Sequence, residues 1–286
     1  MIKNISYIIY KFLYYIDFLF EKIFKRSLLI FFKEFIENKS YKTIIICGKK
    51  ANFFIPNIIS KWRVETFYTK EPETIEWIDS FKNDRKVIFW DIGANIGLYS
   101  IYAAFRYENI NITAFEPSTS NLRILSRNIS KNNLNDKIQI NQFPLTDKKN
   151  KYLIMRESQF IEGGAMNTYG ENYTYSGDDF KTNNQYKLFG TSIDYLIENK
   201  ILEVPNYIKI DVDGIEHLIL RGGINLLKNS ELKSISIELN ENFKDQYNEV
   251  KKIMQNSNFS LKHKKHSEEL EKSIKFSKLY NYIFER

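Results

Sequence analysis

The chain has 286 residues, 43% of them hydrophobic, which is enough for one large α/β domain with an appendage or for two small domains. Its formal net charge is +7, but the basic residues are scattered, so nucleic acid is not expected as a partner. The single cysteine, Cys47, excludes a disulfide framework and a thiol zinc site, and we expect a buried, inert thiol. No cleavable signal is visible at the start, and a cytoplasmic location is expected.

Residues 1–40 form an extension dense in Ile, Leu, Phe and Tyr. Charged residues interrupt every window of about 18 residues, so a membrane span is not predicted. Charges that recur every few residues favour amphipathic helices. Residues 1–36 have three interpretations: helices that cap the main domain, helices that lie in a membrane interface with Lys and Arg facing lipid headgroups, or an oligomer contact. The oligomeric state does not follow from the sequence.

Residues 41–286 are expected to form the main domain, and it begins with a hairpin and a helix. TIIICGKKANFFIPN, residues 43–57, predicts a β-hairpin that turns at residues 48–50. EPETIEWIDSFKND, residues 71–84, predicts a helix, because Pro72 suits a first helical turn and apolar residues follow at helical spacing.

From residue 87 onwards, strand and helix patterns alternate. The predicted strands are VIFWDIG (87–93), NITAFEP (111–117), KIQINQFPL (137–145), YIKIDVDG (207–214) and SISIELN (234–240). Helical patterns follow the first, second and fourth of them, which predicts a parallel sheet covered on both faces. Residues 259–265 and 279–286 predict two further strands, the last of them an antiparallel edge.

Residues 146–190 interrupt the alternation with a polar segment rich in Gly and Tyr. The segment is too long for an ordinary connection. It is either disordered or a loop built over the site, where Tyr169, Tyr173 and Tyr175 would close over an acceptor.

Acidic residues stand at or just after the predicted strand ends, where ligands bind in an open parallel sheet. They are Asp91, Glu116, Asp147, Asp211, Asp213 and Glu238.

The turn DIGANIG, residues 91–97, predicts a cofactor site. Its two glycines let the backbone pass close to a ligand, and the helix behind them favours negative ligand groups. The dinucleotide fingerprint fails at Asn95 and Leu98, and no P-loop Lys follows. An acid beside backbone amides suits a ligand with both an amino group and a carboxylate, as in the methionine part of S-adenosylmethionine. The predicted cofactor-binding residues here are Asp91, Gly93, Ala94, Asn95 and Gly97.

Glu116 ends the second strand, where a carboxylate can accept hydrogen bonds from both ribose hydroxyls of an adenosine ligand. That role does not separate nicotinamide cofactors from S-adenosylmethionine, whereas the glycine pattern does. Asp147, after the third strand, is predicted to belong to the same cofactor site.

Four segments together resemble the FkbM family of S-adenosylmethionine-dependent methyltransferases. They are FWDIGANIGLYS, AFEPSTSNLRILSRNI, GTSIDYLIEN and YIKIDVDGIEHLILRGG, in order between residues 64 and 240. The resemblance implies a seven-stranded, Rossmann-like class I methyltransferase sheet with an antiparallel final strand, and O-methylation of sugars, glycans, lipid-linked saccharides or small metabolites. Asp213 departs from the family pattern, in which Glu is more usual.

Methyl transfer to a hydroxyl needs alignment and a general base. Asp211 and Asp213 are the candidates, since two residues apart on a strand they would point to one side. Two close carboxylates either raise one pKa or hold a divalent cation, and the sequence does not choose. His217 is a weaker candidate, and Glu238 is expected to line the acceptor pocket.

We therefore expect methyl transfer to a saccharide hydroxyl, on a cell-surface glycan or a lipid-linked sugar made at the cytoplasmic membrane face. The N-terminal helices would hold the enzyme near such an acceptor. Two alternatives remain: a methyltransferase acting on a small metabolite or RNA, and an inactive protein that binds S-adenosylmethionine without turnover.

Overall fold

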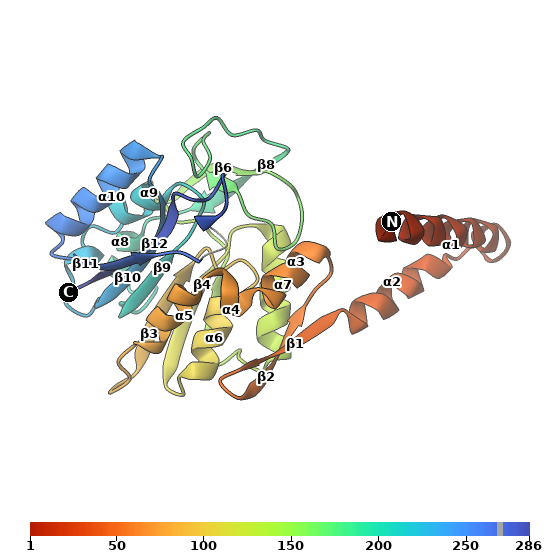
Figure 1. The fold of residues 1–286 in the computed structure, drawn as a ribbon, viewed down its shortest axis with the longest axis horizontal. Coiled ribbons are helices and arrows are strands. Elements are labelled where there is room, and N and C mark those ends of the chain that lie inside the picture. Colours follow the sequence, from red (N-terminus) through yellow and green to blue (C-terminus); the bar gives the residue numbers. More distant parts are fainter. Residues whose placement is uncertain (268–270) are drawn as a thin grey trace.

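A seven-stranded sheet forms the centre of the protein in a computed structural model that describes residues 1–267 and 271–286 (Figure 1). The strand order is β11-β12-β10-β9-β3-β4-β5. The strands are β3 (Val87–Ile92), β4 (Ile110–Phe115), β5 (Ile138–Asn141), β9 (Tyr207–Ile210), β10 (Ser234–Asn240), β11 (Ser260–Lys265) and β12 (Leu279–Glu285). β12 runs antiparallel to both neighbours, and the pairs from β10 to β5 are parallel. The predicted class of fold is confirmed.

The last strand is not the edge of the sheet, so that prediction was wrong. β12 pairs with β10 from Ser234↔Glu285 to Asn240↔Leu279 and with β11 on its other side. β11 forms the edge instead, and its lysine-rich sequence is mostly exposed. Lysines on an edge strand oppose pairing with another chain, which suits this position.

Helices cover both faces of the sheet. Neighbouring residues of a strand point to opposite faces, so apolar side chains on each face are buried against helices. Phe89 packs in one apolar cluster with Trp77 and Ile101, whereas Trp90 packs in the other with Ile219. The helices are α5 (Pro72–Asp79), α6 (Leu98–Arg106), α7 (Thr119–Lys131), α8 (Ile193–Glu198), α9 (Glu216–Arg221), the 3-10 helix η1 (Leu226–Lys228) and α10 (Lys244–Asn256).

The hairpin of β1 (Tyr41–Ile46) and β2 (Lys49–Phe54) packs beside α7 and is followed by α3 (Ile58–Glu65) and α4 (Phe67–Lys70). The backbone N–H of Phe54 donates to Asn128 Oδ1 at 2.7 Å. The hairpin turns at Cys47 and Gly48, earlier than predicted, with φ of 49° and 76°. Cys47 is exposed because it occupies this turn, so the prediction of a buried thiol was wrong.

Residues 146–190 contain a small antiparallel sheet rather than a disordered segment. β6 (Lys151–Glu157) lies between β7 (Asn167–Tyr169) and β8 (Asn184–Gly190). The small sheet lies at the upper side of the central sheet in Figure 1, and several of its side chains face the cavities described below. Of the two interpretations of this segment, the one in which it is built over the site agrees with the structure.

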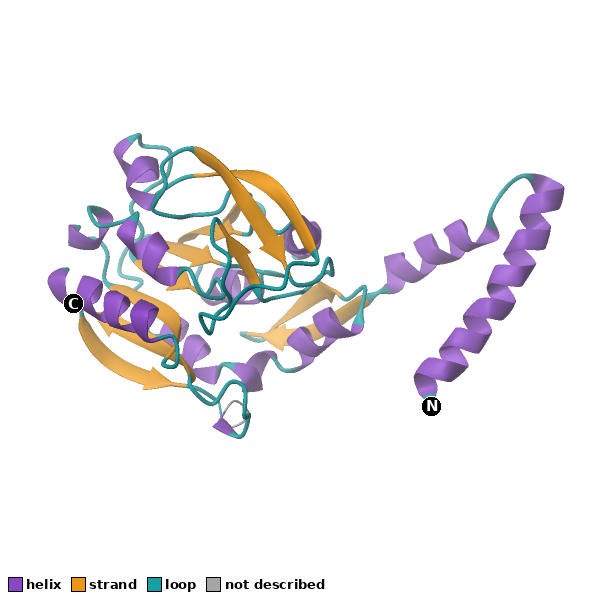
Figure 2. Ribbon diagram, turned by 90° about the horizontal axis from the view of Figure 1, so that it is seen from above, coloured by secondary structure: helices purple, strands orange, loops and turns teal. Residues whose placement is uncertain are grey.

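The first two helices, α1 (Ile2–Phe24) and α2 (Leu28–Lys39), project away from the domain in both views (Figures 1 and 2). The interpretation in which they cap the domain was therefore wrong. Glu37, near the end of α2, forms ion pairs with Arg123 (2.5 Å) and Arg127 (2.6 Å) of α7. Within the described residues, neither of these helices nor any other has the length and apolar character of a membrane span.

Candidate active site

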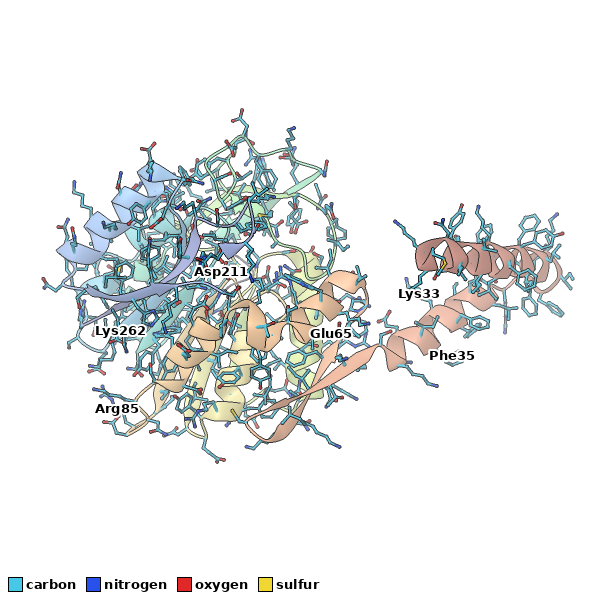
Figure 3. The ribbon with its side chains drawn as sticks, in the orientation of Figure 1. Lys33, Phe35, Glu65, Arg85, Asp211 and Lys262 are labelled. Atoms are coloured by element: carbon cyan, nitrogen blue, oxygen red, sulfur yellow. The ribbon has the colours of Figure 1, made fainter. Side chains whose placement is uncertain are left out.

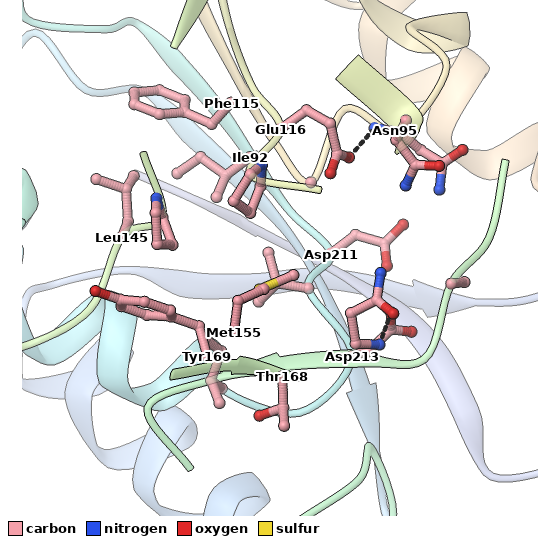
Figure 4. A pocket seen from close by; sticks show the side chains of 18 of the residues that line it. Ile92, Asn95, Phe115, Glu116, Leu145, Met155, Thr168, Tyr169, Asp211 and Asp213 are labelled. Atoms are coloured by element: carbon pink, nitrogen blue, oxygen red, sulfur yellow. Dashed lines mark hydrogen bonds between the residues drawn. The ribbon is translucent and has the colours of Figure 1, made fainter. Parts of the chain in front are cut away.

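Three adjoining cavities lie at the carboxyl ends of β3, β4, β9 and β10. The inner cavity lies between β3, β4 and the inserted sheet (Figure 4). The helix cavity lies beside the start of α6, and the outer cavity, of about 530 Å³, opens between α3, the inserted segment and β10. Gly93, Asn95 and Asp211 line all three. These three residues therefore lie at the junction of the three cavities.

Glycine is required at the start of the turn by the close approach of two chain segments. Gly93 has a φ of 87°, and a Cβ built on it would lie 1.8 Å from the carbonyl oxygen of Asp211. Gly97, with a φ of 86°, directly precedes α6, and its Cβ would lie 2.6 Å from a Leu125 methyl group. Gly93 and Ala94 line the helix cavity, whereas Gly97 belongs to the same turn but does not line the cavity.

Glu116 lies at the end of β4 with its carboxylate in the inner cavity. It accepts hydrogen bonds from the backbone N–H groups of Asn95 (2.7 Å) and Ser118 (2.8 Å), the first of them drawn in Figure 4. Burial raises the pKa of Glu116 to about 7 despite these two donors. Each carboxylate oxygen keeps a second acceptor position, so the group can still accept from ligand hydroxyls.

Apolar side chains form the other wall of the inner cavity. Phe115 ends β4, Leu145 lies in the segment that follows β5, and Met155 and Tyr169 come from the inserted sheet. Such a wall suits a flat aromatic ligand group. Leu145 and Met155 were not predicted, because they belong to no motif and reach the cavity only through the fold of the segment after β5.

Three of the predicted cofactor residues, Asp91, Gly97 and Asp147, do not line the three cavities. Asp91 lies beneath the turn, where the Ser100 hydroxyl donates to its Oδ2 at 2.6 Å, and its buried Oδ1 has no hydrogen-bond partner among the described residues. Asp147 pairs with Arg221 at 3.1 Å, on the outside of the site. Several residues separate Asp147 from the end of β5, so its side chain lies beyond the cavity.

Asp211 is held ionised by a buried lysine. Lys209 is 2% exposed, and its Nζ lies 2.7 Å from Asp211 Oδ2. Burial acts to raise the pKa of Asp211, but the ammonium groups of Lys209 and Lys70 outweigh it and hold that pKa below its usual value.

Asp213 reaches the site from a turn and not from a strand. β9 ends at Ile210, and Asp213 has a φ of 64°. The prediction that Asp211 and Asp213 point to one side because both belong to a strand was therefore wrong. Both still line the inner and outer cavities. Asp213 Oδ2 accepts from the backbone N–H groups of Met166 (2.7 Å) and Asn167 (3.3 Å). Burial and the nearby charge of Asp211 raise the pKa of Asp213 to about 6.

His217 lies away from the three cavities. It is 8% exposed on α9, and its Nε2 lies 3.4 Å from the Tyr173 hydroxyl. Burial lowers the pKa of His217. The structure thus places the predicted weaker base in packing contacts. The neighbouring Glu216 accepts from the backbone N–H groups of Val212 and Gly214 and anchors the turn after β9.

Glu238 faces the outer cavity from the end of β10, as the sequence analysis expected. Its carboxylate has no hydrogen bond or ion pair with the described residues. Burial, together with the charges of Asp211 and Glu71, raises the pKa of Glu238 well above its usual value. Tyr175, which was expected to close over an acceptor, lines the same cavity. Four further lining residues carry no sequence signal, namely Trp62, Arg63, Lys70 and Phe276.

Three acids near the outer cavity have carboxylate oxygens within 4.8 Å of one another: Glu71, Asp211 and Glu238. Lys70 pairs with Glu71 and Lys209 pairs with Asp211, so two of the three negative charges are already neutralised. A divalent cation prefers oxygen ligands without adjacent ammonium groups. The donor set therefore does not fit a bound cation, and no step is assigned to one.

Comparison with known proteins agrees with this geometry. Residues 91–261 match the methyltransferase FkbM domain. The chain belongs to the FkbM methyltransferase family. The matched region contains the glycine turn and the acids at the carboxyl ends of β9 and β10. The chain is therefore a methyltransferase, and its family and fold imply S-adenosylmethionine as the methyl donor.

This FkbM methyltransferase is similar to a curated protein and to several solved structures. It is 23% identical over 200 residues to hexuronic acid methyltransferase AglP of Haloferax volcanii, covering 70% of this chain and 75% of that one. An FkbM methyltransferase structure from Methylobacillus flagellatus matches 80% of this chain and 52% of its own, with 13% identity and a TM-score of 0.49. The precorrin-6y C5,15-methyltransferase of Geobacter metallireducens matches 74% of this chain and 86% of its own, with 12% identity and a TM-score of 0.44.

Proposed function

We propose that this protein transfers a methyl group from S-adenosylmethionine to a hydroxyl of a saccharide, and that an acidic saccharide is the preferred acceptor. The observation that supports this most is the outer cavity of about 530 Å³, which opens onto the junction of Gly93, Asn95 and Asp211. Its wall combines aromatic rings, which suit sugar faces, with polar groups. The sugar acid named for the Haloferax relative is of the same chemical class.

We assign one cavity each to the adenosine of the donor, to the amino acid part of the donor and to the acceptor. The apolar inner cavity would take the adenine, with Glu116 accepting from the ribose hydroxyls. The helix cavity contains both cationic and anionic groups, which suits the amino acid part of the donor. The methyl group would then lie near Asp211, facing the outer cavity.

Arg63 is the proposed partner of an acceptor carboxylate. Its Nε donates to the Gly163 carbonyl at 2.6 Å, and it forms no ion pair with the described residues. Lys70, by contrast, is already paired with Glu71. The remaining guanidinium donors of Arg63 suit a carboxylate, because the planar group binds carboxylates in pairs of hydrogen bonds.

When bound, S-adenosylmethionine supplies an already activated methyl group. The protein aligns the acceptor oxygen and accepts one proton. Glu238 is the proposed base, because its carboxylate is unpaired among the described residues, faces the outer cavity and has a pKa raised well above its usual value. Asp211, which Lys209 keeps ionised, is the weaker base, and we assign it a positioning role at the junction.

The test measures methyl transfer from labelled S-adenosylmethionine to glucuronic acid glycosides and to the matched neutral glucosides. Glu238→Gln should lower kcat by about 10²- to 10⁴-fold, with the donor Kd unchanged. Asp245→Asn, on the exposed start of α10, is the control. Full activity of Glu238→Gln would reject Glu238 as the base, and methylation of RNA or of a small non-sugar alcohol in place of any saccharide would reject the proposed acceptor.

A further inference from the structure

The N-terminal helices expose an apolar face that the described part of the chain does not cover. Seven residues of α1 recur at spacings of one to four residues and share one face of the helix. They are Ile5, Ile8, Ile9, Phe12, Ile16, Leu19 and Ile23, each at least 38% exposed. α2 adds Ile30, Phe31, Phe32, Phe35 and Ile36, which are also exposed. Figure 3 shows the side chains of both helices standing clear of the domain.

A buried carboxylate fixes the two helices to each other. Asp17 of α1 is 8% exposed and accepts hydrogen bonds from the backbone N–H groups of Leu28 (2.5 Å) and Leu29 (3.1 Å) and from the Ser27 hydroxyl (2.8 Å). These are free donors at the start of α2, so Asp17 caps that helix from outside. The pair is therefore a defined helical hairpin whose apolar face points away from the Asp17 contact.

The hairpin has an excess of positive charge. Its basic residues are Lys3, Lys11, Lys22, Lys25, Arg26, Lys33 and Lys39. None of them forms an ion pair with the described residues. Of its acids, Asp17 caps α2 and Glu37 pairs with two arginines of the domain, which leaves Glu21 and Glu34 to offset the basic groups.

We propose that the α1–α2 hairpin is a docking element for an anionic lipid surface. A helix with one apolar face and free basic residues lies in the plane of a membrane interface, with its apolar side chains among the upper acyl chains. The basic residues are attracted by anionic headgroups. This binding does not depend on the proposed acceptor or on catalysis.

A second copy of the chain is the competing occupant. Residues 2, 5, 9, 12, 16, 19 and 23 of α1 also match the two core positions of a heptad. A coiled coil, however, places complementary charges beside that seam, and here the flanking positions include Ile8, Leu13, Tyr15 and Phe20. The wide apolar face and the unpaired basic residues favour lipid over a second helix.

The test is sedimentation of the full-length protein with vesicles of phosphatidylcholine alone or with 30% phosphatidylglycerol. The protein should pellet with the anionic vesicles and several-fold less with the neutral ones. Ile9→Asp with Ile16→Asp should reduce binding at least fivefold. Tyr7→Asp with Tyr14→Asp places the same charges at the same spacing on the opposite face and should reduce it less than twofold.

Equal losses for the two pairs, or no binding to anionic vesicles, would overturn the proposal. So would a lipid-free dimer, seen by light scattering, that Ile9→Asp with Ile16→Asp converts to a monomer. Methyl transfer to a soluble acceptor should be the same in wild type and both pairs, so a failure of lipid binding is distinguishable from a failure of the proposed function.

Discussion

The buried Lys209 forms an ion pair with Asp211, which lies at the point where the three cavities meet. Their charged atoms lie 2.7 Å apart, and the Lys209 ammonium also lies 5.0 Å from the centre of the Tyr99 ring. The lysine lies one residue before the end of β9, and the aspartate follows directly after the strand. Lys209 on β9 therefore keeps the Asp211 carboxylate of the site ionised.

Removing one member of this pair should be costly. Lys209→Met leaves Asp211 without its main partner and should lower the free energy of unfolding by about 3–5 kcal/mol. Adding Asp211→Asn to it should recover part of that loss, because the uncompensated charge is gone. Denaturant unfolding of the two single variants and the double variant measures this coupling, and strictly additive losses would contradict it.

The turn after β3 should not tolerate a side chain. Gly93→Ala forces a Cβ against the carbonyl of Asp211 and should cost several kcal/mol of stability and abolish donor binding. Gly48→Ala is the matched control, since Gly48 also has a positive φ but no atom within 4 Å of the new Cβ. It should cost about 1–2 kcal/mol and leave the donor Kd unchanged, as calorimetry would show. Similar effects for the two variants would argue against the close approach.

Glu116 should make both stability and donor binding depend on pH. Its pKa is raised to about 7, so in the free protein its contribution to stability is present at low pH and is lost as the pH rises through about 7. Ligand hydroxyls favour the ionised carboxylate, so donor affinity should rise about tenfold between pH 6 and pH 8. Glu116→Gln should flatten this dependence, and an unchanged slope would assign the titration to another group.

Arg63 should determine the affinity for the acceptor and not the affinity for the donor. Arg63→Gln removes a charge-assisted pair, worth about 1.5–3 kcal/mol, and should raise the KM of an acidic saccharide about 10- to 100-fold. The KM of the matched neutral saccharide and the donor Kd should stay within twofold. Lys61→Gln, two residues earlier on the exposed side of α3, is the control. A weaker donor Kd in Arg63→Gln would place the guanidinium on the donor's carboxylate instead.

Local patterns predicted the sheet, the glycine turn and the acids at its edge, because strand ends and tight turns leave marks over a few neighbouring residues. Long-range placement was not predictable in this way. Arg63 reaches the outer cavity only through the packing of α3, Asp147 is diverted to Arg221, and His217 packs beside Tyr173. The inserted sheet and the inner position of β12 depend on pairings between distant segments, which no local period encodes.

The most direct test of the account is thermal unfolding of the purified protein with S-adenosylmethionine, S-adenosylhomocysteine or NAD, in wild type and Glu116→Ala. A ligand at a hundred times its Kd adds about 2.7 kcal/mol of stability, which raises Tm by a few degrees. We expect this rise in Tm with the first two ligands and not with NAD, and we expect Glu116→Ala to abolish it. A rise with NAD, or no rise with S-adenosylmethionine, would contradict the assignment of the turn after β3 to a methyl donor.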